Sequence, residues 1–128
     1  MTVEYINGIN SAPKAVGPYS QAVKYGDLYF LSGQIALNPE TGQLAGDSIE
    51  IQTEQVLKNI QAVLKSQNLN FSNVVKTTIF LTDLAHFKTV NSIYEEWLGE
   101  SKPARSTIQV AGLPLNSIVE IEMIAAKK

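Results

Sequence analysis

Two charged residues lie in stretches that otherwise have the composition of β-strands. Arg105 lies within Pro103–Ile108, and Glu120 lies within Val119–Ile121. A guanidinium presents a planar fork that suits two-point contact with a carboxylate. A Glu beside apolar surface has its ionised form disfavoured, which suits it to act as a general base or acid near neutral pH. The strand pattern alone favours a structural salt bridge, or two side chains that simply face water. The rest of the chain indicates instead that the pair forms a site for a small carboxylate.

Four other positions could complete such a site. Tyr19 follows a stiff Gly-Pro pair, so its phenol either points into a pocket or packs over the edge of the core. Ser32 and the amide of Gly33 could donate to an anion, although Gly33 could instead mark a β-bulge. Asn91 falls on the apolar stripe of a predicted helix, where an unpaired amide costs about 1–3 kcal/mol. It therefore either binds nearby backbone or points into a site.

Composition excludes several other kinds of site. The chain has 128 residues, which predicts one domain covering residues 1–128. It has no Cys and one His, His86, so thiolate chemistry is excluded, and a His-rich metal site or a Ser-His-Asp triad is disfavoured. A net charge of −2 and a pI of about 5.3 argue against nucleic-acid binding. We expect no metal, no cofactor and no membrane span, and a soluble, cytoplasmic protein.

The elements that would position these residues follow from periodicity and turn signals. We expect a short strand at 3–6, a hairpin of 21–25 and 28–34 around Gly26-Asp27, a helix from Asp47 to about 68, and a strand at 74–82. A helix at 84–98 that stops at Gly99 and strands at 104–111 and 118–126 complete the chain. This order predicts an α+β fold with both helices on one face of a sheet and the other face covered by oligomerisation.

The last two strands could form a hairpin around residues 112–116. Arg105 would then lie opposite a residue near Ile124, offset from Glu120 by about four residues, or roughly 13 Å. In that arrangement the two charges would not pair within one chain. They would meet only through another strand order, across an interface or across a bound ligand.

Several short motifs follow one another in one order, which is far more specific than any one of them alone. They are Gly17-Pro18-Tyr19-Ser20-Gln21, Ser32-Gly33-Gln34, Asn38-Pro39-x-Thr41-Gly42, Val90-Asn91-x-x-Tyr94, Pro103-Ala104-Arg105-Ser106 and Val119-Glu120-Ile121. With them the chain resembles, from end to end, the RidA/YjgF family of enamine/imine deaminases. The resemblance implies a chorismate-mutase-like fold whose final strand inserts into the sheet. It also implies a homotrimer with three clefts between subunits.

The resemblance also implies the site residues and the reaction. By resemblance, the site positions are Tyr19, Ser32, Asn91, Arg105, Thr107 and Glu120, with Thr107 where deaminase members often have Cys. The Gly33 amide, next to Ser32, is a further candidate for substrate binding. The implied substrates are short 2-imino acids such as 2-iminobutanoate and 2-iminopropanoate, hydrolysed to 2-oxo acids and ammonia without a cofactor. Arg105 would bind the carboxylate while Glu120 activates water. The alternatives are a sensor that binds a 2-oxo acid without turnover and, less favoured by the acidic pI, an endoribonuclease.

Overall fold

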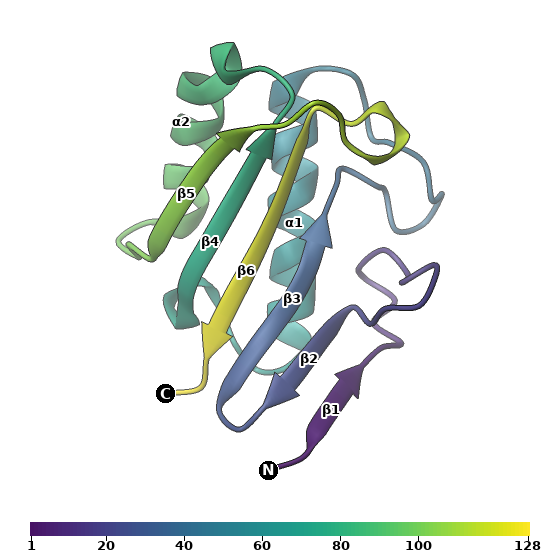
Figure 1. Cartoon of the computed structure of the whole chain (residues 1–128), viewed down its shortest axis with the longest axis vertical. Helices are drawn as coiled ribbons and strands as arrows, with labels where there is room; N and C mark the ends of the chain where they lie inside the picture. The colour runs from purple at the N-terminus through teal and green to yellow at the C-terminus, as the bar shows by residue number, and fades with distance from the viewer.

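A six-stranded mixed sheet forms one layer of the molecule (Figure 1). The computed structural model describes all residues, Met1–Lys128. The strands are β1 (Val3–Ile6), β2 (Ala22–Tyr25), β3 (Leu28–Gln34), β4 (Val74–Leu81), β5 (Ala104–Gln109) and β6 (Val119–Ala126). They lie in the order β1-β2-β3-β6-β4-β5, and only β4 and β5 are parallel. The hairpin predicted around Gly26 is confirmed as β2–β3, with Gly26 at a φ of 62°.

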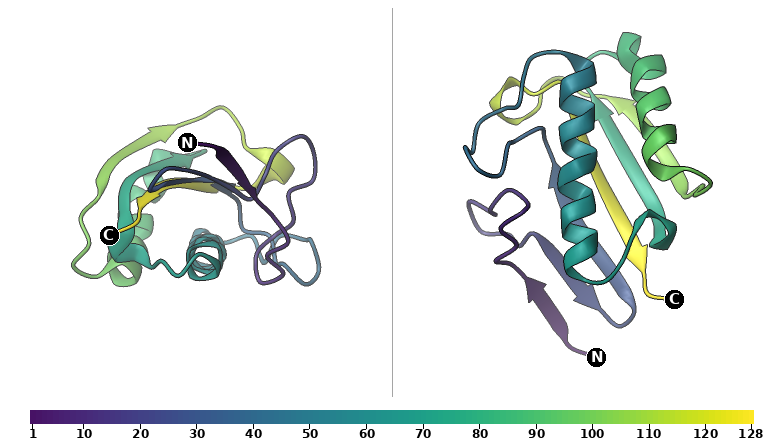
Figure 2. Two further views of the ribbon diagram at one scale, coloured as in Figure 1. Left: turned by 90° about the horizontal axis from the view of Figure 1, so that it is seen from below. Right: turned by 180° about the vertical axis from the view of Figure 1, so that it is seen from behind.

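Both helices lie on the same face of the sheet, as predicted (Figure 2). They are α1 (Ile49–Ser66) and α2 (Phe87–Leu98). The predicted start of the first helix at Asp47 is wrong, because the Ser48 hydroxyl accepts a hydrogen bond from the Ile51 amide and so provides the N-cap. The predicted stop of the second helix at Gly99 is confirmed, with a φ of 61°. Neither helix combines the length and the apolar character that crossing a membrane needs.

The last strand does not pair with the one before it in sequence. β6 lies between β3 and β4 and is antiparallel to both, whereas β5 pairs with β4 alone. The hairpin of the last two strands is therefore wrong, and the insertion implied by the family resemblance is confirmed. The physical reason is burial: alternate residues of β6 from Val119 to Ala125 are fully buried, while β5 has no buried residue and sits at the sheet edge.

The two faces of the sheet have different surroundings. Thr77, Ile79 and Leu81 of β4 face the helices and are almost fully buried. The opposite face has no helix over it, as the view along the sheet shows (Figure 2). Large apolar side chains remain on that face, such as Phe30 at 41% exposed and Ile108 at 44%. An uncovered apolar face of this kind agrees with the predicted oligomer, which stays a prediction.

One buried amide joins α1 to the loop that follows β3. Asn59 is fully buried, and its Nδ2 donates to the carbonyl oxygens of Leu37 (2.8 Å) and Ile35 (3.3 Å). We predict that Asn59→Ala lowers the free energy of unfolding by about 2–3 kcal/mol, because two carbonyls lose their donor. Urea denaturation would measure the change. Lys58→Ala, at an exposed neighbouring position of the same helix, should change it by less than about 0.5 kcal/mol. A loss for Asn59→Ala no larger than that of Lys58→Ala would contradict this account.

Candidate functional site

Arg105 and Glu120 lie on opposite faces of the sheet. Thr77 pairs with Arg105, and Phe80 pairs with Glu120. Residues directly opposite one another on neighbouring strands point to the same face, and successive residues of a strand alternate. Because Thr77 faces the helices, Arg105 also does, whereas Phe80 and Glu120 face the uncovered side. A salt bridge between the two within one chain is therefore excluded.

Helix α2 holds the Arg105 guanidinium. Nη1 of Arg105 donates to Oδ1 of Asn91 at 2.8 Å. The guanidinium carbon lies 5.6 Å from the ring centroid of Phe87 and 5.1 Å from that of Tyr94, within the range of cation–π attraction. Asn91 therefore pairs with a side chain and does not tie off backbone. The spacing of four and three residues puts all three partners on one face of the helix.

A pocket of about 340 Å³ surrounds this arginine, which is the chain's single Arg. We call it the Arg105 pocket; it is lined by Asn91, Tyr94, Glu95, Leu98, Gly99, Ser101, Lys102, Pro103 and Arg105. Only Nη1 donates to a protein acceptor, so other N–H groups of the fork remain available for a carboxylate. The predicted partner Thr107 is two residues further along β5, on the same face, and its buried hydroxyl has no partner in the protein.

Phe87 and Tyr94 are contacts of Arg105 that sequence reasoning missed, because it assigned both to the apolar stripe of the helix. Burial raises the pKa of the Tyr94 phenol above its ordinary value of 10.0, and the Thr77 hydroxyl and the Arg105 charge oppose that shift. The phenol thus stays neutral and presents its ring to the cation. The sequence signal for this contact was the spacing of Phe87 and Tyr94 from Asn91, which puts all three side chains on one face of the helix.

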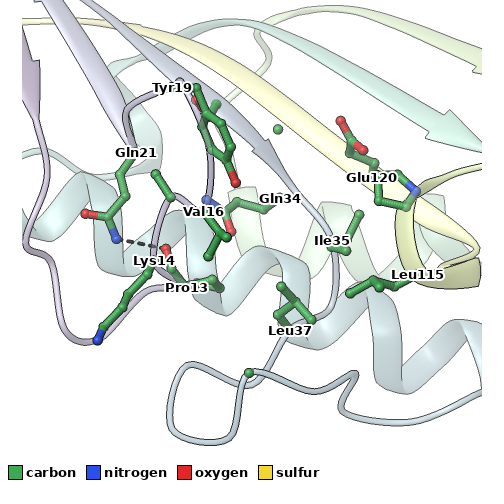
Figure 3. A pocket seen from close by; sticks show the side chains of 15 residues that line it. Pro13, Lys14, Val16, Tyr19, Gln21, Gln34, Ile35, Leu37, Leu115 and Glu120 are labelled. Atoms are coloured by element: carbon green, nitrogen blue, oxygen red, sulfur yellow. Dashed lines mark hydrogen bonds between the residues drawn. The ribbon is translucent and has the colours of Figure 1, made fainter.

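A second pocket, of about 360 Å³, brings together four predicted residues (Figure 3). We call it the Glu120 pocket; the four are Tyr19, Ser32, Gly33 and Glu120. Tyr19 is 54% exposed and lines this pocket, so it does not pack over the core edge. Neither Arg105 nor Asn91 lines it. The structure therefore divides the predicted residues between two separate pockets of one chain, and Thr107 lines neither of them.

A β-bulge positions the residues of β3 in the Glu120 pocket. The pairing of β3 with β6 shifts register between Leu31 and Gln34, at Ser32 and Gly33. A Cβ on Gly33 would collide with the Glu120 carboxylate and lie 3.0 Å from its Cδ, so glycine lets the carboxylate lie against the backbone. The Ser32 hydroxyl donates to the Ser20 carbonyl at 2.5 Å. Its only proton is thus engaged, and Ser32 can accept a hydrogen bond but not donate one to an anion.

Gln21 is a buried residue that sequence reasoning did not single out. Its Nε2 donates to the carbonyls of Pro13 (2.9 Å) and Ile9 (3.1 Å), and its Oε1 accepts from the Ile9 amide at 3.0 Å. These bonds tie the loop that carries Tyr19 to the start of β2. An amide beside a loop rich in Gly and Pro was the only sequence signal.

Glu120 has the electrostatic character of a general base. Burial raises the pKa of its carboxyl above the ordinary value of 4.5, and the nearby charge of Glu122 raises it further. Glu122 lies two residues along β6 and faces the same side. A carboxylate with raised proton affinity takes a proton from water more readily than an ordinary surface Glu.

Together, the fold and the two pockets define a small α+β protein with a candidate site for a small carboxylate. Residues 9–127 match the family model described as Endoribonuclease L-PSP. The chain is 59% identical over 114 residues to Reactive Intermediate Deaminase A, chloroplastic, of Arabidopsis thaliana, which covers 89% of this chain and 61% of that protein. It is 47% identical over 116 residues to the 2-iminobutanoate/2-iminopropanoate deaminase of Mus musculus, covering 91% and 86%.

Solved structures agree with these matches. The YjgF gene product of E. coli superposes with a TM-score of 0.91 at 40% identity, covering 98% of this chain and 99% of that one. E. coli TdcF with bound serine gives 0.91 at 37% identity, covering 98% and 100%. The chain belongs to the RidA/YjgF family, and the α+β fold implied by the resemblance is confirmed.

The two causes of the Glu120 shift can be separated by substitution. We predict that Glu122→Gln lowers the pKa of Glu120 but leaves it above 4.5, because burial, the larger cause, remains. Titration of the side-chain carboxyl carbons by NMR would measure this. Glu96→Gln, an exposed position on α2, serves as the control and should not move the Glu120 titration. A Glu120 pKa that returns to 4.5 in Glu122→Gln would show that burial is not the main cause.

Proposed function

We propose that this protein hydrolyses short 2-imino acids, such as 2-iminobutanoate and 2-iminopropanoate, to 2-oxo acids and ammonia. The observation that carries the proposal is the division of the site. Arg105 with Asn91 forms one pocket, and Glu120 with Tyr19 and Gly33 forms another, on opposite faces of one sheet. The names of the Arabidopsis and mouse relatives support the choice of reaction.

A second copy of the chain would supply the missing half of each pocket. In the Glu120 pocket the one cationic residue is Lys14, whose ammonium points away from the cavity (Figure 3). In the Arg105 pocket the one carboxylate is Glu95, which is exposed on α2. If one copy presents its Arg105 pocket to the Glu120 pocket of the next, the contact is head to tail, and it forms a ring when the rotation between successive copies closes. A homotrimer with three such clefts is the assembly that the family resemblance implies.

In this arrangement each side chain has one task. The free N–H groups of Arg105 bind the substrate carboxylate in two-point contact, which fixes the C=N carbon. Glu120 takes a proton from a water molecule as the water oxygen bonds to that carbon, and passes this proton to the imine nitrogen, which gives a carbinolamine. The hydroxyl proton of the carbinolamine then moves through Glu120 to the nitrogen while the C–N bond breaks and the C=O bond forms, so ammonia and the 2-oxo acid leave and the carboxylate is regenerated. The Tyr19 hydroxyl and the Gly33 amide orient the reacting groups.

The required acceleration is modest, because imines hydrolyse in water unaided, so positioning and one base suffice. Thr107 replaces the thiol that deaminase members often carry, and no step above needs sulfur. A site that binds a 2-oxo acid without turnover is the alternative, and the bound serine of TdcF shows that a relative of this fold holds a small amino acid.

Mixing two inactive variants tests the shared site. Imine released by a threonine dehydratase is followed as its semicarbazone. We predict that Arg105→Ala and Glu120→Ala each lower the enzymatic rate by about 100-fold. When the two are unfolded and refolded together in equal amounts, about one quarter of wild-type activity should return, because random mixing gives about one intact site in four.

The controls for this experiment are Lys88→Ala and Glu96→Ala, which remove exposed charges on α2 outside both pockets and should keep full activity. Loss of imine no faster with wild type than with Arg105→Ala would overturn the deaminase proposal. The shared site would be overturned if either single variant kept the wild-type rate. It would also be overturned if the refolded mixture of the two variants were no more active than each variant alone.

A matched pair of glycines tests the role of the Glu120 position. We predict that Gly33→Ala lowers kcat/KM at least about tenfold, because the added methyl displaces the Glu120 carboxylate. Gly112→Ala adds the same methyl where no atom lies within 4 Å and should leave kcat/KM unchanged. Equal activities for the two variants would show that the observed position of Glu120 does not matter for turnover.

A further inference from the structure

Four buried hydroxyl groups have no hydrogen-bond partner within the protein. They belong to Thr53, Thr77, Tyr94 and Thr107. Burying a hydroxyl without a partner is costly, so most buried polar groups bind either another protein group or an ordered water molecule. Thr53 lies on α1, whereas the other three lie close to Arg105 in the fold. The proposed reaction gives these three hydroxyls no task.

The register of β4 and β5 brings two of the hydroxyls beside Arg105. Thr77 pairs directly with Arg105, and Ile79 pairs with Thr107 in the next position on the same face. The side chains of Thr77, Arg105 and Thr107 therefore all point to the face of the sheet that the helices cover (Figure 2). Thr77 is fully buried there.

Tyr94 approaches the same place from α2. Its side chain is 7% exposed, and its ring centroid lies 5.1 Å from the guanidinium carbon of Arg105. The Thr77 hydroxyl lowers the pKa of the Tyr94 phenol, which agrees with two oxygens that face each other. They nevertheless form no direct hydrogen bond of ordinary distance and angle. A water molecule commonly bridges two polar groups that are separated in this way.

The chemistry of this cluster suits a water molecule. A buried water makes about three hydrogen bonds, and each of the three hydroxyls can either donate or accept one. The neighbouring guanidinium of Arg105 disfavours a cation. An organic ligand has no access from the two pockets to the threonine hydroxyls, because neither Thr77 nor Thr107 lines the Arg105 pocket or the Glu120 pocket.

We propose that Thr77, Tyr94 and Thr107 bind one buried water molecule between α2 and the β4–β5 pair. The water fixes the Tyr94 ring against the guanidinium of Arg105. Tyr94 is thus a positioning residue that touches Arg105 directly, and Thr77 is one that acts through the water. The water site stands on the contacts above, and its effect on ligand binding rests on the proposed function.

Two variants of nearly unchanged shape test the water site. Thr77→Val and Tyr94→Phe each remove one of the hydroxyls that bind the water. We expect each to lower the melting temperature by about 3 °C or more, because the remaining hydroxyls lose their shared partner. The double variant should lose little more than either single variant, since both act on the same water. An unchanged or higher melting temperature in both single variants would overturn the water site, because replacing an unpartnered hydroxyl by an apolar group is neutral or stabilising.

Calorimetry with 2-oxobutanoate tests the positioning role. We expect Thr77→Val and Tyr94→Phe to weaken binding about fivefold, because the ring no longer holds the guanidinium in place. Thr77→Ser keeps the hydroxyl and should bind within about twofold of wild type. Thr53→Val is the matched control: it makes the same chemical change at the unpartnered hydroxyl on α1 and should leave binding unchanged. Equal affinities for wild type and Thr77→Val would overturn the positioning role.

A high-resolution crystal structure provides the direct observation. It should contain a water oxygen within hydrogen-bond distance of the Thr77 and Tyr94 hydroxyls. A direct hydrogen bond between these two hydroxyls, with no water beside them, would overturn the water site. If wild type neither hydrolyses an imine nor binds 2-oxobutanoate, the proposed function falls, while the melting temperatures and the crystal structure still decide whether the water site exists.

Discussion

The alternation of side chains along a β-strand is the constraint on which the rest of this structure depends. Arg105 and Glu120 lie on the two strands that flank β4, yet the pairing register puts them on opposite faces of the sheet. No rotamer change brings them together, and a shift of one residue in register would expose the core side chains of a strand. Chemistry that needs both groups must therefore be assembled from two copies of the fold.

Each half is held by a different structural device. The guanidinium lies against two rings and an amide that share one face of α2, so the helix fixes the orientation of the fork. The carboxylate lies against a bulge in β3, where the missing side chain of Gly33 leaves it space. Both devices are parts of regular elements, which hold functional groups more accurately than free loops.

Local signals in the sequence predicted the two helices and the first hairpin, and they singled out Arg105 and Glu120 as candidate site residues. The pairing of β6 could not be read locally, because the chain order suggests a hairpin while burial of its apolar face decides the observed place. Tyr94 belongs to the buried core, as its place on the apolar stripe predicts, and its ring also lies beside the guanidinium, as that of Phe87 does. This second contact could not be predicted, because an aromatic stripe has the same spacing whether or not a cation lies against it.

The presence of Thr107, where deaminase members often have Cys, affects how the protein responds to oxidants. The chain contains no cysteine, so it has no thiol that peroxide or thiol-directed electrophiles could modify. Oxidation of a thiolate to sulfenic acid therefore cannot occur in it. None of the candidate site residues carries sulfur, so oxidation of a thiol cannot inactivate the site.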